Sequence, residues 1–150
     1  MASTHATART PARPGRGRIA VLIFGDLIAF MLFAAIGRSS HGEAAGLDAL
    51  LQVAGTAAPF VAGWLIVAPA LGAYGLRTAG GARRMLGRTT LAWLAAWPLG
   101  LGLRALALQR GIPVSFALVT LASVLAILAS WRGAFALLEA RRSPLTSRGA

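Results

Sequence analysis

The residue of this sequence that could most readily carry chemistry is Asp26, a single acid within a long apolar stretch. It interrupts residues 19–36, which read IAVLIFGDLIAFMLFAAI. A carboxylate that faced lipid from such a segment would be costly, so we expect Asp26 to face protein and to be either ion-paired or protonated. Intramembrane acids mark ion or proton paths, but they also hydrogen-bond neighbouring helices. Both interpretations of Asp26 are open from the sequence.

A second polar group, Arg38, His41 and Glu43, follows directly after that stretch. An imidazole beside a carboxylate can bind a proton, a metal or an anionic head group. A lone histidine and glutamate fall short of a zinc signature, so we predict no metal site. An ordinary solvated loop is the alternative that requires no ligand.

Arg104 lies near the end of the third apolar stretch. Its side chain can snorkel to the membrane interface, or it can point inward and contact an anion. Arg38 and His41 are expected at a similar depth, so together they would accept a phosphate or carboxylate if the helix ends converge. A salt bridge between Arg104 and Asp26 is not expected. At a helical rise of about 1.5 Å per residue, the two residues lie at depths in the membrane that differ by about 12 Å.

The usual sequence signatures of enzymes are missing from this chain. The sequence contains no cysteine, which excludes disulfides, thiolate metal sites and a catalytic thiol. We find no phosphate-binding loop, no HExxH, no GxSxG and no paired carboxylates at a useful spacing. We therefore predict no catalytic residue and no cofactor.

The composition indicates that lipid surrounds most of the protein. Of 150 residues, 57% are hydrophobic and 13% charged, whereas a soluble domain has about a quarter charged residues. A helix needs about 20 apolar residues to span a bilayer. We predict an all-α membrane protein, a bundle of four transmembrane helices. The predicted spans cover residues 19–36, 56–74, 89–108 and 114–131.

The arginines predict how these spans are oriented. The formal net charge is +11, and twelve of the fifteen basic residues, all arginine, precede the first span, connect the second to the third, or follow the fourth. Basic segments stay in the cytoplasm, so both termini are predicted to be inside. We assign the chain to a cell membrane as a multi-pass protein. The charge is thereby explained without nucleic acid as a partner.

Residues 18–140 are predicted to form the transmembrane domain, flanked by disordered cytoplasmic tails at 1–17 and 141–150. A cleaved signal peptide is the competing interpretation of the first span, but a signal core is usually only ~7–15 residues and seldom carries an acid.

Prolines and glycine mark the expected packing of the spans. Pro59 is expected near the start of the second span, Pro98 predicts a kink in the third, and Pro113 suits the first turn of the fourth. Gly100 shares a helical face with small residues that permit close helix packing. In each half of the chain an outer arginine precedes a helix opened by proline and phenylalanine, which suggests two repeated helical hairpins.

Four stretches together resemble a known family, the domain of unknown function 3054. They are GDLIAFMLFAAIGRSSHGE (25–43), TAAPFVAGWL (56–65), WPLGLGLRAL (97–106) and RGIPVSFALV (110–119). The resemblance implies a prokaryotic multi-pass membrane protein with four helices, and it implies no substrate, cofactor or catalytic residue. The characteristic polar positions of the family correspond here to Asp26, Arg38, His41, Glu43 and Arg104.

Two classes of function remain open from the sequence. The first is a small permease handling an ion or solute, or a helical partner subunit, acting without catalysis and built around Asp26. The second is an outer-leaflet protein that binds a lipid head group, or a membrane-embedded enzyme, built around Arg38, His41 and Glu43. The expected partners are the lipid bilayer and either further copies of the chain or other membrane subunits.

Overall fold

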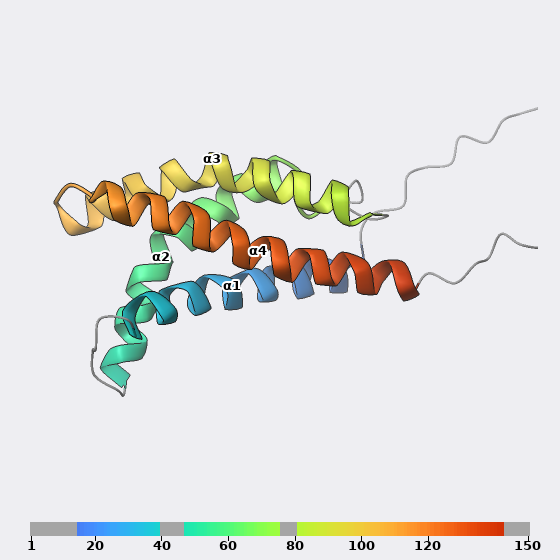
Figure 1. Ribbon diagram of the computed structural model, residues 1–150, viewed down its shortest axis with the longest axis horizontal. Coiled ribbons are helices and arrows are strands. Elements are labelled where there is room, and N and C mark those ends of the chain that lie inside the picture. The colour runs from blue at the N-terminus through green and yellow to red at the C-terminus, as the bar shows by residue number, and fades with distance from the viewer. Residues whose placement is uncertain (1–14, 40–46, 76–80, 143–150) are drawn as a thin grey trace, which may run out of the picture.

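The computed structural model describes residues 15–39, 47–75 and 81–142. Within these ranges the chain is almost entirely helical and contains no strand. The helices are α1 (Arg16–Ser39), α2 (Leu47–Ala70), α3 (Ala82–Leu108) and α4 (Val114–Arg142) (Figure 1). Each is long and apolar enough to cross a membrane, which confirms the all-α class and the number of candidate spans.

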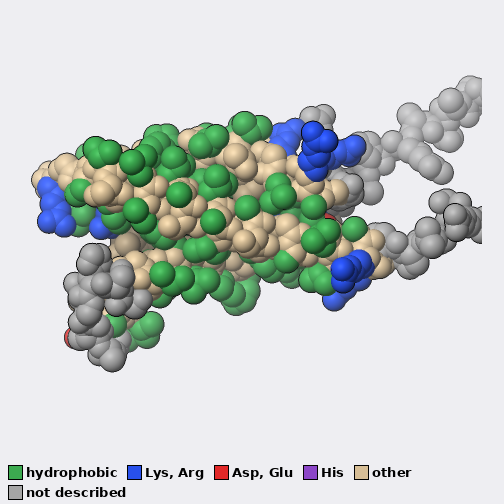
Figure 2. Space-filling model, in the orientation of Figure 1, with side chains coloured by type: hydrophobic (Ala, Val, Ile, Leu, Met, Phe, Trp, Pro, Cys, Tyr) green, Lys and Arg blue, Asp and Glu red, His purple; other side chains and the backbone are tan. Residues whose placement is uncertain are grey.

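The outer surface of the helices carries large apolar side chains. Phe24, Leu47 and Val114 are 65%, 72% and 73% exposed, which would be unfavourable in water. Figure 2 shows hydrophobic side chains along the length of the molecule, with the arginines gathered towards its two ends. This distribution is expected of helices whose middle sections face lipid and whose ends face the interfaces.

The helices pack in chain order around a common interior. Helix α1 packs against α2 and α4, and α3 packs against the same two helices. Because consecutive helices alternate in direction, α1 begins and α4 ends at the same end of the molecule, here called the terminal end (Figure 1). The opposite end, called the far end, holds the α3–α4 connection. The assignment of the terminal end to the cytoplasm remains a prediction from the arginine count.

Helix α2 begins earlier than its predicted span. It starts at Leu47 instead of residue 56, and it ends at Ala70 before a turn that contains Tyr74. Residues 47–52 are mostly Leu, Ala and Gln, which favour helix, and Asp48 in the first turn complements the helix dipole. Pro59 therefore lies in the interior of α2 and not near its start.

Helix α4 continues past its predicted end at residue 131 to Arg142. Its last turns are rich in Ala and Leu, and Arg141 and Arg142 suit the negative end of the helix dipole. Parts of both predicted tails, residues 16–17 and 141–142, are consequently helical. Residues 1–14 and 143–150 lie outside the described residues.

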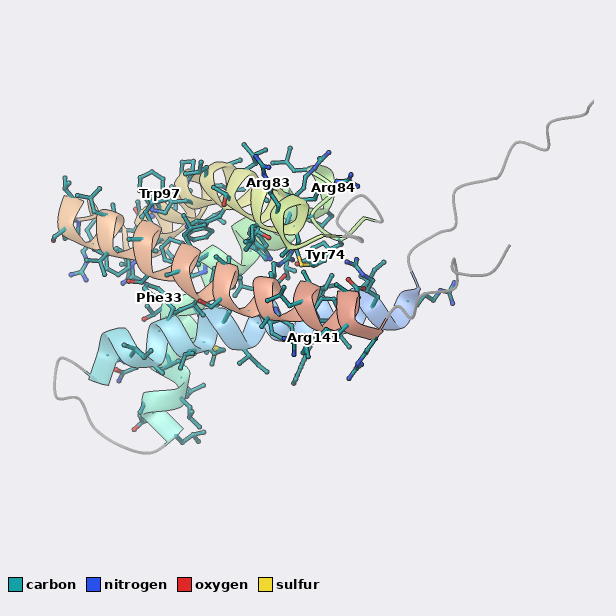
Figure 3. All side chains as sticks on the ribbon, turned by 45° about the vertical axis from the view of Figure 1, so that its right-hand side comes forward. Phe33, Tyr74, Arg83, Arg84, Trp97 and Arg141 are labelled. Atoms are coloured by element: carbon teal, nitrogen blue, oxygen red, sulfur yellow. The ribbon has the colours of Figure 1, made fainter. Side chains whose placement is uncertain are left out.

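A cluster of aromatic rings fills the interior at the level of mid-helix. Phe30 of α1 lies 6.2 Å from Trp64 of α2 and 5.6 Å from Trp93 of α3, measured between ring centroids. The indole of Trp93 donates a 3.0 Å hydrogen bond to the Leu121 carbonyl of α4. Trp97, labelled in Figure 3, donates a 3.1 Å bond to the Ala117 carbonyl. These side chains connect all the helices, and the indole N–H groups of Trp64, Trp93 and Trp97 all have hydrogen-bond partners.

Small residues allow the closest helix approaches. A Cβ added at Gly63 of α2 would lie 3.0 Å from the Ala96 carbonyl oxygen and 3.2 Å from the Gly100 nitrogen of α3. A Cβ at Gly25 of α1 would overlap the Trp131 ring of α4. In lipid, where the hydrophobic effect does not drive helix association, such contacts supply much of the packing energy.

Candidate functional site

Asp26 and Arg132 form a buried ion pair between α1 and α4. The side chains of both are almost completely buried, at 1% and 0% exposure. Arg132 donates through Nε to Oδ1 at 2.9 Å and through Nη2 to Oδ2 at 2.5 Å. This two-pronged geometry gives a guanidinium its strongest contact with a carboxylate. Asp26 thus faces protein, and of the two states expected for it, ion-paired or protonated, the structure has the ion-paired one.

Two further donors complete the surroundings of the carboxylate. The Tyr74 hydroxyl donates to Asp26 Oδ2 at 2.6 Å, and the Trp64 indole donates to the same oxygen at 2.9 Å. Arg132 also donates through Nη1 to the Ala73 carbonyl at 2.9 Å. Its guanidinium lies 5.1 Å and 4.8 Å from the ring centroids of Trp64 and Tyr74, within the range of cation–π attraction.

This arrangement, here called the Asp26 cluster, links α1, α2, α4 and the α2–α3 connection. A buried charge pair is tolerated only when its remaining donors and acceptors are satisfied, and the bonds above meet that requirement. A carboxylate that already accepts four hydrogen bonds is poorly placed to exchange protons with a substrate. The geometry favours an interhelical cross-link over an ion path.

Tyr74 lies in the connection after α2, and burial raises the pKa of its hydroxyl, with the neighbouring Asp26 carboxylate raising it further. Unfolding exposes the hydroxyl and returns it to its ordinary pKa of about 10. Above pH 10 the unfolded chain therefore binds fewer protons than the folded protein. The contribution of Tyr74 to the free energy of unfolding is complete below that pH and declines as the pH rises above it.

We expect the folded protein to form no tyrosinate at pH 10–11, where an exposed tyrosine ionises. Tyr74 is the single tyrosine of the chain, so the change in ultraviolet absorbance that accompanies tyrosine ionisation reports on it alone. The loss of stability over this pH range should be smaller in Tyr74→Phe, which serves as the control. Tyrosinate appearing near pH 10 while the helices stay folded would contradict the buried donor role.

A second polar site lies at the far end, in a pocket of about 570 Å³ here called the arginine pocket. Arg38 from the end of α1, Arg104 from α3 and Arg110 from the α3–α4 connection all line it. Hydroxyl and apolar side chains complete the walls, including Thr56, Ser115, Thr120, Phe33, Phe116 and Val119.

Every charged side chain in the described lining of the arginine pocket is an arginine. None of the described residues that line it is acidic. The Arg104 guanidinium stacks 4.6 Å from the Phe116 ring centroid, and Arg38 donates to the Gln52 amide oxygen. The Thr120 hydroxyl is fully buried and has no hydrogen-bond partner in the structure. The described lining of the pocket thus offers guanidinium and hydroxyl groups.

The family model of a protein of unknown function, DUF3054, matches residues 23–135 of the chain. The chain belongs to this family. The matched region includes both the Asp26 cluster and the arginine pocket. No curated protein and no solved structure matches the chain.

In this DUF3054 family member, the structure brings together only some of the residues singled out from the sequence. Arg38 and Arg104 share one pocket, whereas Asp26 lies elsewhere, in the interior. His41 and Glu43 lie outside the described residues.

Two charged residues of these sites, Arg132 and Arg110, were not singled out from the sequence. Arg132 was interpreted as a cytoplasmic charge beyond the fourth span, although it pairs with Asp26. The sequence carries no clear signal for this pair, because the matching depth of the two residues becomes apparent only once α1 is known to begin at Arg16 and α4 to end at Arg142. Arg110 was not singled out, although it is one of three arginines outside the basic segments, and these three line the arginine pocket.

Proposed function

We propose that this protein binds an oxyanion, a phosphate or carboxylate, in the arginine pocket and acts without catalysis. The observation that supports the proposal is the convergence of Arg38, Arg104 and Arg110 on one cavity whose described lining contains no acid. If the termini face the cytoplasm, as the arginine count predicts, the pocket opens at the outer face of a prokaryotic cell membrane.

The physical basis is the cost of holding like charges together. Guanidiniums that share a half-buried pocket repel one another, and an anion between them converts that repulsion into attraction. The planar fork of arginine matches the oxygens of phosphate or carboxylate and donates two parallel hydrogen bonds to them. Among the two classes of function open from the sequence, this geometry supports the binding protein.

The permease interpretation has less support. It required Asp26 as a carboxylate available to a moving ion, but Arg132, Tyr74 and Trp64 already occupy its oxygens. Association with further copies of the chain or with other membrane subunits is compatible with anion binding and remains a prediction.

The anion proposal predicts a specific dependence on Arg104. Sodium phosphate should raise the unfolding temperature of the purified protein in a neutral detergent above that in sodium chloride of equal ionic strength. Arg104→Gln removes one charged donor, worth about 1.5–3 kcal/mol, and should weaken phosphate binding roughly 10- to 100-fold. The matched control is Arg83→Gln, because Arg83 is an exposed arginine at the other end of the same helix (Figure 3).

Phosphate should stabilise the native protein and the Arg83→Gln variant equally. If Arg104→Gln and Arg38→Gln respond to phosphate as the native protein does, the anion does not bind in the arginine pocket and the proposal fails. The unfolding temperature of each variant in chloride alone shows that the folded state being compared is intact.

A further inference from the structure

Resting on the proposed function, we infer that the anion in the arginine pocket is the phosphate of a membrane phospholipid. Its acyl chains would run along the seam between α1 and α4. The inference depends on the depth of the pocket, on its apolar wall and on the unpartnered Thr120 hydroxyl.

The surface around the arginine pocket is that of a lipid-facing helix. Arg104 lies one turn before Leu108, the last residue of α3, which shares its helix face and is 40% exposed. On α4, Leu118 and Val119 are 57% and 59% exposed, and Val119 lines the pocket itself. At this level the pocket borders acyl chains and head groups, so a lipid reaches it from within the bilayer.

Thr120 also lines the pocket, and its buried, unpartnered hydroxyl is a second polar group for a ligand to reach. Thr120 lies six positions after Val114, the first residue of α4, so at about 1.5 Å per residue it is about 9 Å into the helix. A buried hydroxyl without a partner is unfavourable. A phospholipid carries ester oxygens on the acyl side of its phosphate, so it can bind the guanidiniums and also accept a hydrogen bond from Thr120. Inorganic phosphate held by the arginines lacks this second group.

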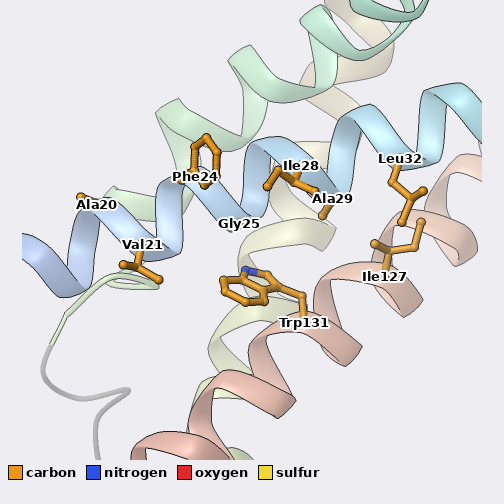
Figure 4. A pocket seen from close by; sticks show the side chains of 9 residues that line it. All are labelled: Ala20, Val21, Phe24, Gly25, Ile28, Ala29, Leu32, Ile127 and Trp131. Atoms are coloured by element: carbon orange, nitrogen blue, oxygen red, sulfur yellow. The ribbon is translucent and has the colours of Figure 1, made fainter.

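An apolar groove lies farther along the same seam. Its volume is about 570 Å³, and it is lined by Phe24, Ile28 and Leu32 of α1 and by Ile127 and Trp131 of α4, among others (Figure 4). Leu32 directly precedes Phe33, which lines the arginine pocket, so the groove follows the pocket along α1 towards the terminal end.

The groove has a limited energetic role. Lipid chains are already in an apolar solvent, so the groove orients the acyl chains but contributes little to the binding free energy. The selectivity for a phospholipid must therefore reside in the polar contacts of the arginine pocket.

The test compares three probes on the purified full chain in neutral detergent, using thermal unfolding and native mass spectrometry. The probes are phosphatidylglycerol, diacylglycerol with the same chains, and inorganic phosphate. We expect phosphatidylglycerol to bind at least tenfold more tightly than inorganic phosphate and diacylglycerol not to be retained.

Thr120→Val separates the lipid from the free anion. The substitution keeps the shape of the side chain and removes an unpaired hydroxyl, so the unliganded protein should fold as well as the native one. Phosphatidylglycerol binding should weaken roughly 5- to 10-fold, the loss expected for one hydrogen bond, while inorganic phosphate binding stays unchanged. Ser130→Ala is the matched control, because Ser130 is an exposed hydroxyl on the same helix that donates to the Ala126 carbonyl.

Each outcome supports or overturns the inference. The inference is overturned if diacylglycerol is retained as strongly as phosphatidylglycerol. It is also overturned if Thr120→Val and Ser130→Ala lose lipid binding equally. Phosphate binding that depends on Arg104 without any gain for the lipid would overturn the lipid assignment and leave the proposed function standing. If neither phosphatidylglycerol nor inorganic phosphate shows binding that depends on Arg104, both the lipid assignment and the proposed function are overturned.

Discussion

Replacing Arg132 by methionine is expected to lower the free energy of unfolding by about 3–5 kcal/mol, because it leaves the Asp26 carboxylate buried without its counter-charge. The residual donors, Tyr74 and Trp64, cannot replace the lost cation. Unfolding of the purified protein in mixed micelles, followed by helicity, measures this change. Arg83→Met, at an exposed arginine of α3, is the matched control and should change stability by no more than about 0.5 kcal/mol.

A double variant tests whether the pair itself stabilises the fold. Asp26→Leu combined with Arg132→Met replaces both charges by apolar groups, and it should recover much of the stability lost in Arg132→Met alone. Recovery would show that the cost in the single variant comes from the stranded charge. If Arg132→Met is as stable as Arg83→Met, the Asp26 cluster contributes little to the fold.

A further variant of the Asp26–Arg132 pair tests the transport interpretation of Asp26. Asp26→Asn removes the charge, keeps the shape and strands the buried Arg132 guanidinium, so we expect a large loss of folded protein. A stable Asp26→Asn variant that had lost an ion flux in proteoliposomes would instead assign the carboxylate to transport.

Substituting Gly63 by valine is the second change expected to be severe. Its new Cβ would meet the Ala96 carbonyl oxygen at 3.0 Å and the Gly100 nitrogen at 3.2 Å, and both are backbone atoms that no side-chain rotation can move. Helices α2 and α3 would have to separate. We expect a loss of about 3 kcal/mol in the free energy of unfolding, at the upper part of the usual range for overpacking.

Gly55→Ala on the same helix is the control for this substitution. A Cβ at Gly55 meets nothing within 4 Å, and alanine favours helix over glycine by roughly 0.5–1 kcal/mol, so stability should hold or rise. Both variants are compared by the same unfolding measurement. Equal stability of Gly63→Val and Gly55→Ala would mean that α2 and α3 are not in close contact at this crossing.

The sequence by itself determined the class of the protein and the environment of Asp26. Four long apolar stretches predict four helices because the length and hydropathy of a segment are local properties. An acid within such a stretch must face protein, whatever the details of packing, since lipid cannot solvate it. The family resemblance was likewise readable from local motifs, and the match to DUF3054 confirms it.

Only the tertiary structure decided which charges meet. Asp26 and Arg132 are 106 positions apart, and their contact depends on the depth and rotation of two helices that the sequence does not specify. Arg132 was missed because it directly follows the predicted fourth span and was counted with the cytoplasmic arginines, whereas α4 carries it into the interior. Arg38, Arg104 and Arg110 likewise became a pocket only when the helix ends converged. The local sequence around an arginine near a helix end does not indicate whether the side chain faces water, lipid or another charge, because its partner comes from a distant segment.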